Sequence, residues 1–547
     1  MLAQNAETLA TARHQAVRRE EKGAIMKNKE NFLYKKYDDL GQGEFVDNIA
    51  AATFALVSFV FSNKYFDITA TRASTFLYVF GAFIIFKLVI AVIDVCSCRY
   101  YKIDKPWLYT ERFSIEWPDF WALLFLIANV ISCIHCISPG LAFSGAMGRG
   151  MGAGFMIILC LGVIVIGRVC WVGDVNYYFF MALSAVSVIM AILQHFKFDV
   201  FYLRKDIAKG QGEKFISLFG NMNTYGSFLA FAIPIFFALF IFAVADWVKI
   251  SSGIMLFLMA LGVIPAKSDN VYLGAGVALV VLFYISIYYR KVLEFMISVT
   301  IFTVGLYVMA VMSRAFGGSK KAINGIAGFV ENPKMMLILP ITMMVITIAV
   351  LIFKIRHRAL YKMVQCKKTL WIITVLGTFC VALVIYIGSK GSHTQIFRFD
   401  DDWGTYRGFI WKRSWRAFLA GSPLDKIFGY GNDMLLPVMK DMYYDEMIAL
   451  TGKVYDNAHN EVLQYLVTLG IFGAVSYIGL CVSTFIYIIR RLDKDPILIA
   501  LLVGIVGYLG AGLVYLNQPI TTPYLFVMIA FAIGYVRYKG WKKHFNL

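Results

Sequence analysis

Long apolar runs alternate with short polar stretches along most of the chain. Each run is about 18–22 residues long, the length that an α-helix needs to cross about 30 Å of hydrocarbon. The pattern predicts an all-α polytopic membrane protein with about fourteen transmembrane helices. The predicted spans lie at 45–63, 74–97, 117–138, 151–168, 176–193, 224–244, 247–265, 271–289, 293–312, 334–353, 369–388, 462–488, 496–516 and 522–537.

Basic residues in the short connections predict the orientation in the membrane. Short cytoplasmic loops of polytopic proteins carry an excess of Lys and Arg. With fourteen spans, the basic connections fall on one side together with both termini, so we predict that both termini are cytoplasmic. The predicted organisation is a basic tail at 1–44, helices 1–11 at 45–388, a large extracytoplasmic loop at 389–458, helices 12–14 at 459–537 and a basic tail at 538–547.

The composition excludes a soluble protein. Hydrophobic residues make up 59% of the chain and charged residues 16%, whereas soluble domains average roughly 45–50% and about 25%. The net charge of +18 does not indicate nucleic-acid binding, because the cations are scattered between apolar segments. Cys133 and Cys136 flank His135 inside an apolar run without further ligands nearby in sequence, so we expect no metal site there.

The long loop is the first place to look for function, because loops of this length without an independent fold are usually functional. It contains a predicted helical stretch, Tyr406–Leu419, followed by a Gly-Ser-Pro turn. Within that stretch Arg407 shares a face with Trp411 and Ser414.

His459 stands where the long loop enters the twelfth predicted span. Asp456 or Asn457 is a suitable N-cap, and Glu461 falls in the first turn. This position is near the positive end of a helix dipole, which favours the neutral imidazole that a general base needs. A histidine that merely packs on a helix end gives the same pattern, so the residues alone leave both interpretations open.

The outer loops are also cationic. Arginine binds phosphate oxygens bidentately, and several arginines together suit a diphosphate. Exposed loop cations are usually only solvated, so this interpretation requires a connection to His459. The cations concerned are Arg314, Lys320, Lys321, Arg398, Arg407, Lys412, Arg413 and Arg416.

Three motif-like stretches follow one another between residues 218 and 480. They are Gly220-Asn221-Met222-Asn223 leading to Pro234; Arg407 to Trp411 with Ser422-Pro423-Leu424 and Phe428-Gly429-Tyr430-Gly431-Asn432; and Ala458-His459-Asn460-Glu461 to Gln464 with Leu469-Gly470-Ile471-Phe472-Gly473. As an ordered set they resemble the O-antigen ligase and polymerase superfamily of bacterial envelope glycosyltransferases.

The resemblance implies transfer of a glycan from an undecaprenyl-diphosphate donor to an acceptor hydroxyl of a glycan or lipid at the outer face of the membrane. It implies inversion at the anomeric carbon without a metal or other cofactor. His459 would activate the acceptor and Arg407 would hold the diphosphate. Asn223, Asn460 and Glu461 are the further substrate-binding candidates within the motifs.

One stretch departs from the family pattern. The family often has a Ser-Arg pair at the outer start of the span equivalent to the eighth, and Asp269 stands at the place of that arginine. Lys267 or Arg314 is the candidate replacement in the diphosphate clamp.

The sequence does not choose between a ligase and a polymerase. The alternative from another class is a flippase of lipid-linked glycans or another multi-span transporter. A flippase should carry charged residues within the bundle and have short loops on both faces. The sparse intramembrane charge and the single large outer loop favour the enzyme.

Overall fold

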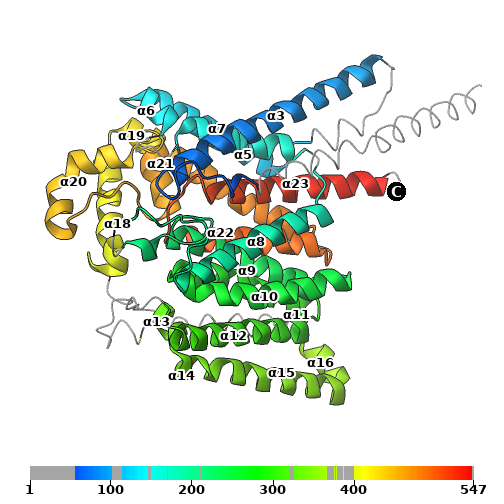
Figure 1. Cartoon of the computed structure of the whole chain (residues 1–547). Coiled ribbons are helices and arrows are strands. Elements are labelled where there is room, and N and C mark those ends of the chain that lie inside the picture. Colours follow the sequence, from blue (N-terminus) through cyan, green and yellow to red (C-terminus); the bar gives the residue numbers. More distant parts are fainter. Residues whose placement is uncertain are drawn as a thin grey trace, which may run out of the picture.

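The computed structural model describes residues 56–100, 114–145, 150–168, 170–208, 211–318, 326–365 and 399–544, together with positions 372, 375, 377, 383 and 386. All regular structure within these ranges is helical, and no strand occurs there. Figure 1 shows most of the long helices side by side in one bundle, as the sequence pattern predicts. The all-helical architecture is therefore confirmed for the described residues.

The helices of these ranges, in chain order, are α3 Ile68–Tyr100, α5 Trp117–His135, α6 Pro139–Ser144, α7 Ala153–Ile166, α8 Asp174–His195, a 3-10 turn Gly212–Lys214, α9 Met222–Phe242, α10 Asp246–Ala266, α11 Asn270–Tyr288, α12 Val292–Ala315, α13 Ile326–Glu331, α14 Pro333–Met336, α15 Ile338–Arg356, α16 Arg358–Val364, α18 Trp403–Ala420, α19 Pro423–Phe428, α20 Leu435–Thr451, α21 Glu461–Ile489, α22 Pro496–Gly512 and α23 Thr522–His544.

Twelve of the predicted spans coincide with helices. Nine helices in the described part of the chain are long and apolar enough to cross a membrane, and α7 and α22 are shorter apolar helices. Of the first predicted span, 45–63, only residues 56–63 are described, and they form two helical residues followed by turns. The eleventh, 369–388, lies outside the described residues apart from five positions, as do the tail 1–44 and loop residues 389–398. The count of fourteen stays a prediction.

Helix α9 forms the centre of the bundle. Its apolar residues surround the whole helix, and 89% of its most apolar stretch is buried, mainly against α10, α11 and α22. Small residues allow this close packing: a Cβ on Gly507 of α22 would lie 2.3 Å from the backbone oxygen of Ala230 in α9. By contrast, only 11% of the corresponding stretch in Pro333–Arg356 is buried, so this segment presents its side chains outward, toward lipid in a membrane.

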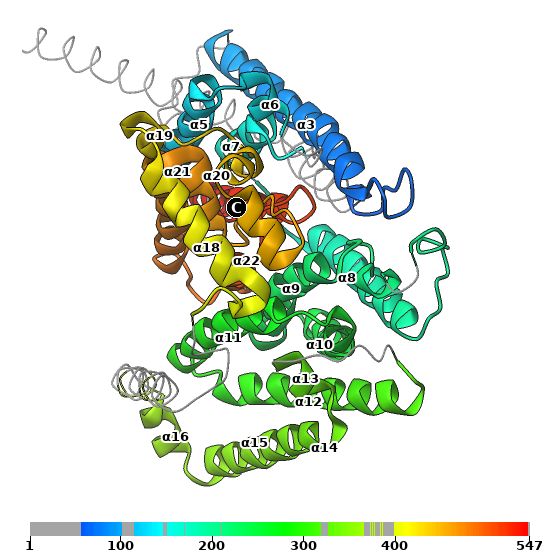
Figure 2. The same ribbon diagram turned by 90° about the vertical axis from the view of Figure 1, so that its left-hand side faces the viewer.

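Helices α18, α19 and α20 lie at one end of the bundle, which we call the loop end, and the C-terminus of α23 lies at the opposite end (Figure 1). Viewed onto the loop end, α18 crosses over the helices beneath it (Figure 2). A hydrogen bond between His195 and Ser313, at 2.9 Å, joins two of the predicted outer connections. Asn432 of the long loop donates to Asn129 of α5 at 2.6 Å, which ties the loop to the bundle. Which end faces the cytoplasm stays a prediction.

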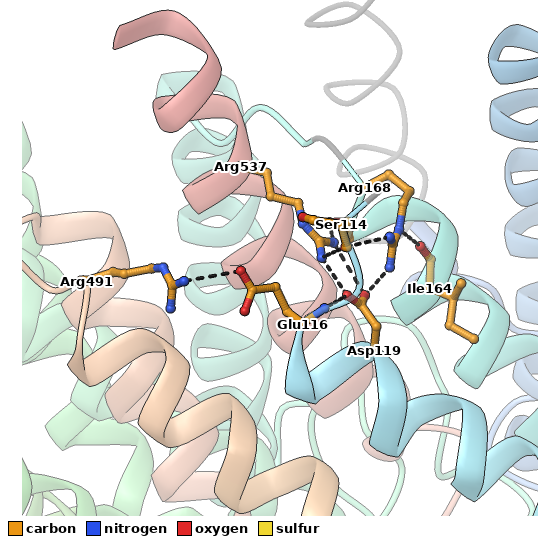
Figure 3. Close-up of polar contacts among 8 residues, drawn as sticks. Ser114, Glu116, Asp119, Ile164, Arg168, Arg491 and Arg537 are labelled. Carbon is orange, nitrogen blue, oxygen red and sulfur yellow. Dashed lines mark hydrogen bonds and ion pairs between the residues drawn. The ribbon is translucent and has the colours of Figure 1, made fainter. Parts of the chain in front are cut away.

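The opposite end is held by a cluster of buried charges (Figure 3). Asp119 at the start of α5 accepts a hydrogen bond from Arg537 of α23 at 2.5 Å and pairs with Arg168, which follows α7. Both arginines also donate to the backbone oxygen of Ser114. One carboxylate therefore joins three helices. Nearby, Glu116 pairs with Arg491 at 3.2 Å on a more exposed surface.

Replacing Asp119 by asparagine is expected to destabilise the protein by about 3 kcal/mol, because removing one partner leaves uncompensated buried charge. The side chains of Asp119 and Arg537 are only 5% and 4% exposed. Glu116→Gln is the matched control, because its pair is about a third exposed and such pairs contribute about 0–1 kcal/mol. The free energy of unfolding in detergent micelles measures both variants. Equal losses would contradict the assigned role of Asp119.

Candidate active site

His459 lies immediately before the first turn of α21, at the loop end. The N-cap is Asn460, whose side chain accepts a hydrogen bond from the backbone N–H of Leu463 at 2.9 Å. The prediction of Asp456 or Asn457 as the cap was wrong, whereas the prediction of Glu461 in the first turn is confirmed. The reason is local: His459 has a left-handed backbone with φ 50°, and the chain must turn there before the helix begins.

Arg407 lies in the first part of α18, at the loop end of the bundle. The predicted helix Tyr406–Leu419 is confirmed within Trp403–Ala420, with positive φ angles at 404–406 just before Arg407. The guanidinium donates from Nη1 to the backbone oxygen of Gly404 at 3.0 Å, and its buried Nε has no hydrogen-bond partner among the described residues. Burial lowers the pKa of Arg407, while Asp269 and Tyr515 act in the opposite direction. The side chain stays a cation, because arginine does not deprotonate in proteins.

Chain neighbours of His459 and of Arg407 pack into one small hydrophobic core. Phe409 of α18, Leu435 and Met439 of α20 and Ala458 pack together in it, all almost fully buried. Arg407 is two residues from Phe409, and His459 is the neighbour of Ala458. The tertiary structure therefore brings the predicted base and the predicted diphosphate ligand to the same end of the bundle on a shared core.

Glycines of two motifs hold the loop against α21. Gly429 and Gly470 both have positive φ, and a Cβ on either would lie 2.3 Å from the other segment's backbone. The close approach lets Tyr430 and Gly431 donate their N–H groups to the backbone oxygens of Val467 and Thr468, at 3.1 and 3.0 Å. Only glycine fits such contacts, which explains why the loop motif and the histidine motif both carry glycine.

Asn223 belongs to a polar cluster between α9 and α11. The Gly-Asn-Met-Asn motif opens α9 as predicted, with Asn221 as the N-cap. The Asn223 side chain accepts from Ser268 at 2.7 Å, and its backbone oxygen accepts from Asn270 at 2.9 Å. These bonds fix the start of α11 beside Asn223. Asp269 lies between these two partners in the chain, and its carboxylate opposes the effect of burial on the pKa of Arg407.

Lys267 lies among carboxylates, and Arg314 is not in the Asn223 cluster either. The side chain of Lys267 is 4% exposed and pairs with Glu213 at 3.7 Å. Burial raises the pKa of Glu331, and the positive charge of Lys267 acts in the opposite direction. Arg314 is exposed at the end of α12. The structure thus surrounds Lys267 with carboxylates and leaves Arg314 accessible.

Glu461 points into the bundle instead of toward the loop. Its carboxylate accepts hydrogen bonds from Tyr477 at 2.7 Å and Tyr508 at 2.5 Å. It also borders a cavity of about 120 Å³ between α21 and α22, lined mostly by apolar side chains. Both carboxylate oxygens are occupied by tyrosine hydroxyls, so this geometry favours a role in anchoring the start of α21.

The remaining loop cations bind acidic residues within the loop. Lys412 pairs with Asp401 at 2.9 Å, and Arg413 pairs with Glu446 at 2.8 Å. Arg416 is exposed on α18. Lys320, Lys321 and Arg398 lie outside the described residues. Among the loop cations that the structure describes, Arg407 is the one whose guanidinium is enclosed close to the histidine motif.

The connection between α22 and α23 is a part of the site that the motifs did not predict. Its Asn517 accepts a hydrogen bond from Asn457 at 3.0 Å. Gln518 donates to Thr224 of α9 at 2.9 Å. The signal that could have found this connection is the polar Asn517-Gln518 pair before Pro519, in a short link between two spans.

No group of three or more His, Cys, Asp or Glu side chains is arranged to hold a metal ion in the part of the chain that the structure describes. Cys133 and Cys136 are buried free thiols.

A bundle of apolar helices with a helical loop region over one end defines a multi-span membrane protein. Within it, residues 335–478 match the model of the O-antigen ligase family. The match contains both Arg407 and His459, and it confirms the resemblance to the O-antigen ligase superfamily. A comparison with curated proteins finds no match.

Proposed function

We propose that the protein transfers a glycan from an undecaprenyl-diphosphate donor to an acceptor hydroxyl at the outer face of the cytoplasmic membrane. The loop end would face outward, where lipid-linked glycan and acceptor meet. The observation that carries the proposal is that chain neighbours of Arg407 and of His459 pack into the same small core. Both residues lie inside the segment that matches the family. The basic residues at the opposite end support this orientation.

His459 would act as the general base. The acceptor oxygen attacks the anomeric carbon while an imidazole nitrogen takes the proton of the attacking hydroxyl. A new C–O bond forms as the bond between the anomeric carbon and the phosphate oxygen breaks. Attack opposite the leaving group inverts the anomeric configuration. The place of His459 just before a helix N-terminus supports a neutral imidazole, because the helix dipole disfavours an added positive charge there.

Arg407 would stabilise the departing undecaprenyl diphosphate. Negative charge accumulates on the leaving oxygen, and a fixed cation in a partly enclosed site stabilises it more strongly than water does. The Nε–H of this guanidinium is buried and has no hydrogen-bond partner in the described part of the chain, which supports a role in binding an anionic ligand. Asp269 partly offsets this charge, and the exposed Arg314 is the candidate second cation. No metal ion is required in this scheme.

The test measures the two products together in membranes with and without the protein, in the presence of EDTA. Transfer predicts that glycan product and free undecaprenyl diphosphate appear in equal amounts. A flippase would move the donor between leaflets without releasing diphosphate, and that result would reject the proposal. Product length and anchor then separate polymerase from ligase: a polymerase extends a lipid-linked chain, whereas a ligase moves it to another anchor.

A further inference from the structure

The connection between α22 and α23, residues 513–521, is buried from Tyr515 onward although it lies at the loop end. Loops normally run over the surface, because buried backbone and side-chain polar groups must find partners. Here the polar side chains of Asn517 and Gln518 are only 8% and 7% exposed. Their side chains form hydrogen bonds with Asn457 before α21 and with Thr224 in α9, so this segment, which we call the 513–521 connection, is a structural junction.

One branch of the junction leads to His459. The amide of Asn457 donates to Asn517 at 3.0 Å, and the side-chain oxygen of Asn457 accepts the backbone N–H of His459 at 2.9 Å. His459 has φ 50°, a left-handed conformation that costs a non-glycine residue free energy. The Asn457 side chain compensates this cost by closing a local turn over two residues. Asn517 in turn holds Asn457 in place.

A neighbouring contact holds the start of the helix on the same segment. The side-chain amide of Asn460, the N-cap of α21, donates to the backbone oxygen of Leu513 at 3.0 Å. His459 is therefore attached to the 513–521 connection on both sides, through Asn457 before it and through Asn460 after it.

The other branch leads to α9. The Tyr515 hydroxyl lies 2.8 Å from the hydroxyl of Thr224 in α9, and Gln518 donates to both, at 2.9 and 3.0 Å. The segment that holds His459 is therefore itself fixed to the central helix of the bundle.

We propose that the 513–521 connection sets the position of His459 at the loop end, with Asn457 and Asn517 as positioning residues for the base. This inference rests on the proposed function, because it assigns the connection a role in the same transfer reaction. A displacement of a catalytic group by about 1 Å can cost about 10²-fold in rate. Losing the asparagine pair therefore lowers kcat, whereas the KM for the lipid-linked donor, which Arg407 would bind, changes little.

Aspartate substitutions test the pair without removing bulk. Asn517→Asp keeps an acceptor for the Asn457 amide, and Asn457→Asp keeps an acceptor for His459 while Asn517 can rotate to donate. Each single variant should retain kcat within about threefold, but the double variant places two carboxylates face to face and should lose about tenfold more than the product of the single effects. Asn63→Asp, an exposed change before α3, is the control.

The outcomes separate this inference from the proposed function. A double variant whose loss equals the product of the single losses, at normal membrane abundance, overturns the positioning role. If the double variant does not reach the membrane, Asn457→Ala and Asn517→Ala give the same measurement, and together they should be no worse than the worse single change. If the wild type shows no transfer, or His459→Ala is fully active, the proposed function itself fails.

Discussion

His459→Ala is expected to lower the rate of glycan transfer by about 10²–10⁴-fold, the usual contribution of a general base. The loss should appear in kcat, because the imidazole accepts its proton only as the acceptor attacks. The donor should still bind, since Arg407 remains in place. Simultaneous measurement of glycan product and released undecaprenyl diphosphate checks the prediction, and both should fall together.

His357→Ala is the matched control, because His357 is an exposed histidine at the end of α15. It should retain full activity. Full activity of His459→Ala at normal membrane abundance would show that this histidine is not the base.

A second experiment checks on which side of the membrane His459 lies. In a background without the native cysteines, exposed Lys453→Cys, close to His459 in the chain, should react with an impermeant maleimide in intact cells. Exposed Arg490→Cys, at the end of α21, should react only after the cells are opened. The reverse labelling pattern would put His459 in the cytosol and end the assignment.

Arg407→Ala is expected to reduce transfer by about 10²–10³-fold, the cost of removing one preorganised donor from a site of developing negative charge. The remaining Asp269 would then face the diphosphate without its compensating cation. The KM for donor should therefore rise together with the fall in kcat. Arg407→Lys should lie between the wild type and alanine, because lysine keeps the charge but loses the planar, bidentate geometry.

Arg416→Ala is the matched control for this change, since Arg416 lies on the same helix and is exposed. It should change transfer by less than about threefold, as expected for a solvated charge. Asp269→Asn in the Arg407→Ala background should recover part of the lost activity by removing repulsion. Equal effects of Arg407→Ala and Arg416→Ala would mean that the overall positive charge of α18, and not Arg407 in particular, binds the diphosphate.

The apolar pattern predicted the helices because membrane spans obey a local rule. A run long enough to cross the bilayer must form its hydrogen bonds internally, so helix is the available structure wherever such a run occurs. Twelve predicted spans coincide with helices for this reason, including the short α7 and α22. The order of the helices in space has no such local signal. The central place of α9 depends on contacts such as the approach of Gly507 to Ala230.

The candidate site was predictable in part. His459 and Arg407 could be chosen from the sequence because their motifs are local and lie beside a long loop. The N-cap at Asn460 was not predicted, because the choice among Asp456, Asn457 and Asn460 depends on the turn at His459 and on the bond from Asn460 to Leu513. The surroundings of Lys267 were also not predictable, since its partner Glu213 lies in another connection.

The sequence by itself determined the membrane-spanning helical class, the positions of most helices and the two side chains proposed for the chemistry, because each depends on hydrophobic length or on a short motif. Only the tertiary structure decided that the 513–521 connection holds the histidine, that Glu461 turns into the bundle and that Asp119 joins three helices at the opposite end. These are contacts between residues far apart in the chain, and their partners are chosen by helix packing, which leaves no periodic trace in the sequence.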